Sequence, residues 1–176
     1  CVEALLLLAE IYRSSGEHEG ASKLVRRAAY AVECGFEAGF SPFAQSGAGP
    51  SPSWPRVSLE LPAAGEADES AWPGWPWLAA LSTYMLSLYT QGLNRTAIEV
   101  CKLLLAATLP RDPLHILTRL DVMCLRAHQY DLLLQVSSHL CGQMPSENQG
   151  RFRSLDCSLP NFAYSVALAR RLATGA

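Results

Sequence analysis

The sequence predicts an all-α protein, a solenoid of antiparallel helix pairs that carries a long insertion rich in Pro, Gly and Ser. Three observations predict it. Apolar residues recur with helical spacing along most of the 176 residues. Short turns join the helices two by two, which favours antiparallel pairs. The pattern of the first pair returns further along the chain, as it does in repeat proteins.

The first pair is expected over 1–36, with helices from Val2 to Ser14 and from His18 to Cys34 and a break at Gly16. Helical periodicity then fails. Residues 37–74 hold six of the eleven prolines and five of the twelve glycines. They are expected to form a flexible loop or insertion, because such composition is typical of irregular chain.

The second pair is expected over 75–109. Pro76 suits the first turn of a helix that ends at Gly92, and Asn94 is a good N-cap for the next helix. The third pair is expected over 110–141, where Asp112 caps a helix that begins at Pro113. A second loop covers 142–159. Residues 160–176 then begin a further pair, and the start at Cys1 suggests a piece of a longer protein.

The repeat core is defined by shared positions in the helix pairs. In the first pair these are Leu5, Leu8, Ala9, Tyr12, Gly16, Ala21, Val25 and Ala28. The same frame returns 76 residues later as Leu81, Tyr84, Met85, Leu88, Gly92, Ala97, Cys101 and Leu104. A degenerate third copy follows 36 residues further on as Leu117, Leu120, Asp121, Cys124, His128, Leu133, Ser137 and Leu140. The spacing resembles the tetratricopeptide repeat, and an ordinary helical bundle is the alternative.

Composition excludes several classes of function. The formal net charge is −2 without a block of like charge, so nucleic-acid contact is not expected from this chain. Six cysteines without a CxxC pair favour a reducing, cytoplasmic compartment, and no apolar stretch approaches the ~20 residues that span a membrane. Cys124 and His128 are four residues apart, as metal ligands can be, but the further His and Cys are scattered, so buried thiols and satisfied His are favoured. We expect no catalytic residue, metal or cofactor.

Two surface features have more than one interpretation. The sequence Asn94-Arg95-Thr96 matches a glycosylation site, but a helix cap is the simpler interpretation. Trp72, Trp75 and Trp77 cluster at the end of the insertion. They either anchor the loop end against the solenoid or form an exposed aromatic contact for a partner.

Four ordered blocks resemble one family. They are Ala21 to Tyr30 with Glu33 to Phe36 and Phe40 to Phe43; Asn94 to Leu105 with Asp112-Pro113; Leu120-Asp121 with Leu125 to Ala127 and Tyr130 to Leu133; and Leu159 to Ser165, whose Pro160, Asn161, Phe162 and Tyr164 are the most distinctive. Together they resemble the family of transcription factor 25 and its yeast counterpart, ribosome quality control complex subunit 1. The sequence departs from the family in the insertion and at the start of the helix near Trp75.

The resemblance implies a non-catalytic adaptor of ribosome-associated quality control, assisting ubiquitin-dependent degradation of stalled chains. The implied partners are the large ribosomal subunit and a listerin-type ubiquitin ligase or ubiquitin, in the cytoplasm. Two alternatives remain at this point: a nuclear transcriptional regulator of the same family, and an unrelated tetratricopeptide scaffold for protein interactions.

Overall fold

The computed structural model describes residues 1–35, 74–108, 112–140 and 159–174. These residues form seven helices and no strand, so the all-α prediction is confirmed for the described part of the chain. The expected insertion at 37–74 and the expected loop at 142–159 lie, apart from residues 74 and 159, outside the described residues. The chain divides into two compact units, residues 1–108 and 109–176.

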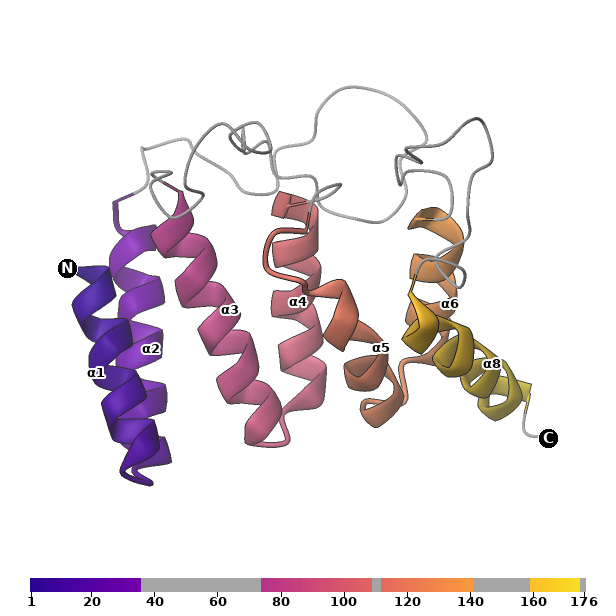
Figure 1. The fold of residues 1–176 in the computed structure, drawn as a ribbon, viewed down its shortest axis with the longest axis horizontal. Coiled ribbons are helices and arrows are strands. Elements are labelled where there is room, and N and C mark those ends of the chain that lie inside the picture. Colours follow the sequence, from indigo (N-terminus) through magenta and orange to yellow (C-terminus); the bar gives the residue numbers. More distant parts are fainter. Residues whose placement is uncertain (36–73, 109–111, 141–158, 175–176) are drawn as a thin grey trace. The chain divides into compact units, whose positions relative to one another are not determined.

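The first unit contains four helices in chain order: α1 (Val2–Ser14), α2 (His18–Glu33), α3 (Trp75–Thr90) and α4 (Asn94–Thr108). Helix α1 packs on α2, α2 on α3 and α3 on α4, and α1 also contacts α3. Within this unit, consecutive helices run in opposite directions (Figure 1). The arrangement consists of two antiparallel pairs joined through α2 and α3.

Small side chains bring the first pair together. Ala9 of α1 meets Ala21 and Val25 of α2, and Leu24 and Tyr84 pack against this cluster. A Cβ atom on Gly20 of α2 would lie 2.6 Å from Cδ1 of Tyr12. The ring of Tyr12 can therefore occupy its position only because residue 20 has no side chain. The pair is close because both helices present little volume where they cross.

Leu8 and Tyr12 differ from the expectation that they belong to the core. Leu8 is 39% exposed and Tyr12 is 36% exposed. The reason is that the helices on which α1 packs, α2 and α3, lie against its other faces. Of the other expected core residues of this unit, Leu5 and Tyr84 are half-buried and the turn residues Gly16 and Gly92 are exposed. The rest are buried: Ala9, Ala21, Val25, Ala28, Leu81, Met85, Leu88, Ala97, Cys101 and Leu104.

The second unit contains α5 (Leu117–Arg126), α6 (Tyr130–Leu140) and α8 (Pro160–Thr174). Each of these helices packs on the other two. The buried apolar residues of these helices include Leu120, Met123, Leu133, Val136, Phe162 and Val166. Helix α8 thus packs on α5 and α6 as α3 packs on α1 and α2, and its place as the start of a further pair stays a prediction.

The start of α5 was predicted wrongly. We expected the helix to begin at Pro113 directly after Asp112, but it begins at Leu117, because Asp112 and His115 have φ angles of +44° and +51°. A left-handed residue interrupts helical hydrogen bonding. Asp112 nevertheless satisfies the helix start: its Oδ1 accepts the N–H of Ile116 at 2.8 Å and its Oδ2 that of Leu117 at 2.9 Å.

Three helix ends share one geometry. Gly16, Gly92 and His128 have φ angles of +86°, +79° and +56°. After each, a backbone N–H donates to a carbonyl five residues earlier: Glu17 to Tyr12 at 2.8 Å, Leu93 to Leu88 at 3.0 Å and Gln129 to Cys124 at 2.9 Å. This is the Schellman motif, which needs a left-handed residue. The third turn forms without glycine.

Tyr130 supports the strained turn at His128. Nδ1 of His128 lies 2.7 Å from the Tyr130 hydroxyl, and the two rings meet edge to face with centroids 5.8 Å apart. Histidine is among the residues that tolerate a positive φ better than most. The ring contact offsets part of the backbone cost that glycine avoids at the other two turns.

Candidate protein-interaction surfaces

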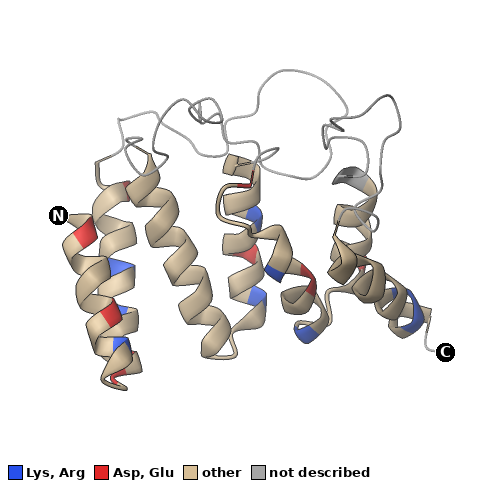
Figure 2. Cartoon of the chain, viewed as in Figure 1, with Lys and Arg blue, Asp and Glu red and all other residues tan. Residues whose placement is uncertain are grey.

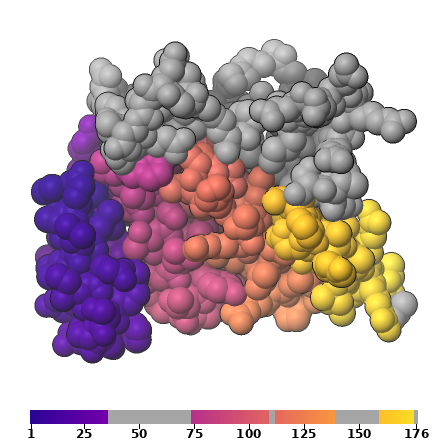
Figure 3. Space-filling model, viewed as in Figure 1, coloured from indigo at the N-terminus to yellow at the C-terminus, as the bar shows by residue number. Residues whose placement is uncertain are grey.

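Among the described residues of the first unit, large exposed apolar side chains gather on α1. Leu7 is 68% exposed and Ile11 is 61% exposed, and with Leu8 and Tyr12 they define the α1 outer face. Side chains at this spacing lie on one side of a helix. The indigo atoms of α1 are visible at the surface in Figure 3. A contiguous apolar face of this kind marks an interaction site in soluble proteins.

A second apolar stripe lies on α8. Tyr164 is 81% exposed, Leu168 45% and Leu172 47%, and the spacing of four residues aligns them along the helix. Phe162, Val166 and Ala169 occupy the opposite side and are buried in the second unit. Helix α8 is therefore apolar on two faces, one packed and one open.

The four distinctive residues near the end of the chain have different environments. Pro160 is the first residue of α8, where its missing N–H costs nothing. Phe162 is completely buried, and its N–H donates to the Leu159 carbonyl at 3.0 Å. Asn161 is half-buried and Tyr164 is exposed. The motif thus combines a helix start, a core anchor and one surface residue.

The structure describes two of the three clustered tryptophans, Trp75 and Trp77. Trp72 lies outside the described residues. Trp75 begins α3 and is half-buried, whereas Trp77 is 4% exposed and belongs to the core. For Trp77 the partner-contact expectation is wrong, because the helix turns this ring inward with Leu78 and Leu81, which are also buried.

A buried polar contact that the sequence did not predict links α5 to α8. The Ser165 hydroxyl donates to Oδ2 of Asp121 at 2.7 Å, and the two residues are 8% and 1% exposed. Oδ1 of Asp121 is buried without a hydrogen-bond partner among the described residues. The sequence pattern did not predict this bond, because helical periodicity does not relate two residues that are 44 positions apart.

Charged residues of both signs are scattered over the described helices, as Figure 2 shows. Ion pairs join Glu10 to Arg13, Glu19 to Lys23 and Glu99 to Lys102, each within one helix and at the surface. The Lys23 ammonium group lowers the pKa of Glu19 by its hydrogen bond and its charge. Such pairs contribute little to folding.

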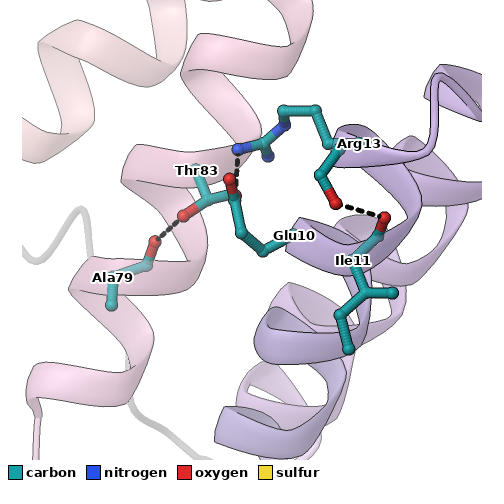
Figure 4. A network of polar contacts seen from close by, with 6 residues as sticks. Glu10, Ile11, Arg13, Ala79 and Thr83 are labelled. Atoms are coloured by element: carbon teal, nitrogen blue, oxygen red, sulfur yellow. Dashed lines mark hydrogen bonds and ion pairs between the residues drawn. The ribbon is translucent and has the colours of Figure 1, made fainter.

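The Glu10–Arg13 pair lies on the part of α1 that faces α3. Figure 4 draws it with Thr83 of α3, whose hydroxyl donates to the Ala79 carbonyl at 2.8 Å. Polar contacts therefore occupy this edge of α1, next to the apolar outer face.

The cysteines divide into buried and exposed thiols. Cys101 and Cys124 are completely buried, Cys1 and Cys34 are exposed, and Cys141 and Cys157 lie outside the described residues. No group of three metal-ligating side chains occurs among the residues that the structure describes. None of the described helices is long and apolar enough to cross a bilayer.

Comparison with known proteins identifies the family. The model of the family described as Transcriptional repressor TCF25 matches residues 1–51 and 77–175. The chain belongs to this family. The gap between the two matched ranges falls within the expected insertion and the start of α3, where the sequence departs from the family pattern.

Three relatives illustrate the similarity. The human protein named ribosome quality control complex subunit TCF25 is 33% identical over 168 residues, which cover 96% of this chain and 21% of the human protein. Ribosome quality control complex subunit 1 of Schizosaccharomyces pombe is 27% identical over the same shares. A Dictyostelium discoideum protein named ribosome quality control complex subunit TCF25 is 36% identical over 91 residues, covering 51% of this chain and 11% of that protein.

The chain therefore spans about a fifth of the length of the human and Schizosaccharomyces pombe relatives. No solved structure matches the chain significantly.

Proposed function

We propose that the chain is part of a non-catalytic adaptor of ribosome-associated quality control. It assists the ubiquitination and degradation of stalled nascent chains on the large ribosomal subunit. Family membership carries this proposal, because members in three organisms are named as subunits of the ribosome quality control complex. The adaptor acts in the cytoplasm, and its partners are the large subunit and a listerin-type ubiquitin ligase or ubiquitin.

The proposed mechanism is the holding of partners by a tetratricopeptide-like array of helix pairs. Two observations support the array: α2 packs on α3 between the first two pairs, and the turns at Gly16, Gly92 and His128 share one hydrogen-bond geometry. Repeated helix pairs bury a continuous core and leave extended surfaces for other proteins. The open stripe of Tyr164, Leu168 and Leu172 is one such surface.

A second candidate function is transcriptional repression in the nucleus, which the description of the family model favours. The balanced charge of the chain does not favour direct DNA binding. Salt-dependent binding of the purified protein to DNA, together with nuclear localisation, would support this second candidate. Membership of the family removes the third alternative, an unrelated tetratricopeptide scaffold.

Affinity purification of the tagged protein from translating cells tests the adaptor. We expect large-subunit proteins and a ubiquitin ligase to be recovered, and ubiquitinated stalled chains to decrease when the gene is removed. A purification that recovers neither would contradict the proposal.

Two matched tyrosine variants locate the contact. Tyr164→Ala removes an exposed ring from the α8 stripe, and Tyr30→Ala removes a 68% exposed ring from α2. Both rings lie at the surface, so both variants should fold normally. We expect weaker recovery of partners with Tyr164→Ala only, since exposed tyrosines at interfaces often dominate binding.

A further inference from the structure

Helices α1 and α3 hold the same position in their pairs, so their faces can be compared residue by residue. Two α3 residues illustrate the contacts of this helix with the preceding pair. Tyr84 packs against the cluster of Ala9, Ala21 and Val25, and Nε2 of Gln91 donates to the Ser22 hydroxyl at 3.2 Å. These contacts define the face with which α3 sits on α1 and α2.

The equivalent face of α1 is uncovered. In the repeat frame, Tyr84 and Gln91 correspond to Leu8 and Ser15, and the intervening Thr83 and Ser87 correspond to Leu7 and Ile11. Thr83, Tyr84 and Ser87 are half-buried in α3, whereas Leu7, Leu8 and Ile11 are 68%, 39% and 61% exposed. The α1 outer face therefore has the position of a packed interface but no described helix on it.

The chemistry of this face is that of an interior surface. Leu7 and Ile11 are more apolar than Thr83 and Ser87, the residues that already face a neighbouring pair. The outer face of a helix that ends a repeat array is normally polar, because it must remain in water. Human and Schizosaccharomyces pombe relatives have about four-fifths of their length outside the matched region, which is ample for further helix pairs.

We propose that a further helix pair of the same polypeptide packs on the α1 outer face, as α1 and α2 pack on α3. The incoming helix that corresponds to α2 carries short apolar residues on its contact side, because α2 meets Tyr84 with Ala21 and Val25. This inference rests on the repeat array of the proposed function and identifies what binds one end of it.

Photo-crosslinking of the protein produced from its own gene tests the inference. A benzophenone amino acid replaces Leu7 or Ile11, and the crosslinked peptides are identified by mass spectrometry. Leu93 is the matched control, since it is 50% exposed and apolar but lies in the turn between α3 and α4. The same benzophenone amino acid in place of Ser15, at an exposed position of the same face, provides a second probe that leaves the apolar residues in place.

The expected result is an intramolecular crosslink from positions 7, 11 and 15 to a helical segment beyond residues 1–176, several-fold stronger than any from position 93. A crosslink to another protein overturns the proposal, as does a crosslink to a second copy, which mixed light and heavy isotope labelling would reveal. Absence of any crosslink also overturns it. Recovery of ribosomal partners is scored separately, so failure of the adaptor function and failure of this inference are distinguishable.

Discussion

Helices α3 and α5, which correspond to each other in the predicted repeat frame, fill their buried centres differently. At the position of Met85, which is completely buried in α3, α5 has Asp121, which is 1% exposed. In α3 the site is filled by apolar volume. In α5 it is filled by a carboxylate that accepts a hydrogen bond from Ser165 of α8. A buried position within a helix can therefore be apolar or polar, and the polar side chain of Asp121 is accommodated by a residue from elsewhere in the chain.

Among the variants that test this comparison, Met85→Ala should lower the free energy of unfolding most. Truncation of a fully buried methionine leaves a cavity and should lower the free energy of unfolding by about 2–5 kcal/mol. Val122→Ala, in α5 but 44% exposed, should cost less than about 1 kcal/mol. Urea denaturation measures both. Equal losses would show that burial does not distinguish the two helices.

Ser165→Ala should have the next largest effect. It leaves Oδ2 of Asp121 buried without its hydrogen bond, which costs about 1–3 kcal/mol. The double variant Asp121→Ala/Ser165→Ala removes both partners, and a double-mutant cycle gives their coupling energy. A coupling near zero would mean that water replaces the serine without loss.

The turns at Gly92 and His128 allow a similar comparison between two backbone positions with positive φ angles. Gly92→Ala places a Cβ on a residue with φ +79° and should lower stability by about 1–2 kcal/mol. His128→Gly relieves the same strain but removes the contact with Tyr130, so its effect should lie within about 1 kcal/mol of zero. Thermal unfolding measures both. A large loss from His128→Gly would show that the ring contact, rather than backbone freedom, maintains the third turn.

The smallest effect is expected from the acid at the start of α5. Burial raises the pKa of Asp112, against the hydrogen bonds from Leu117 and Ile116 and the charge of His115, which lower it. A raised pKa in the folded state means that the folded chain binds the proton more readily than the unfolded chain. Stability should therefore fall as pH rises from the ordinary Asp pKa to the raised value.

The variant Asp112→Asn isolates this effect. Its urea midpoint, followed between roughly pH 4 and pH 7, should lack the part of the slope that Asp112 contributes. The other carboxylates are common to both proteins, so their contributions cancel in the difference. Parallel curves for the two proteins would show that the proton on Asp112 is not linked to folding.

The sequence was sufficient for features that arise from local chemistry. Gly16 and Gly92 mark two turns because a left-handed residue favours glycine, and helical spacing located all seven described helices. The start of α5 was misjudged, since Asp112 and Pro113 resemble a helix start although the chain makes a further turn before Leu117. The residue types at Asp112 and Pro113 do not indicate the turn that separates them from Leu117.

Features that arise from packing were beyond the sequence. The inward position of Trp77 and the exposure of Leu8 depend on which helices cover a given face, and periodicity alone does not say this. The bond between Ser165 and Asp121 depends on α8 packing against α5. The four sequence blocks predicted the family correctly, but the relatives' names do not assign a role to any single residue of the chain.

The buried thiols of Cys101 and Cys124 can report the opening of the two units separately. Each thiol is sealed from solvent, one in the unit of residues 1–108 and the other in the unit of residues 109–176. A thiol reagent can reach either one only after its surroundings open, so the two labelling rates report separate opening events. Equal labelling rates are expected if the two units open together. Unequal labelling rates would show which unit opens more readily.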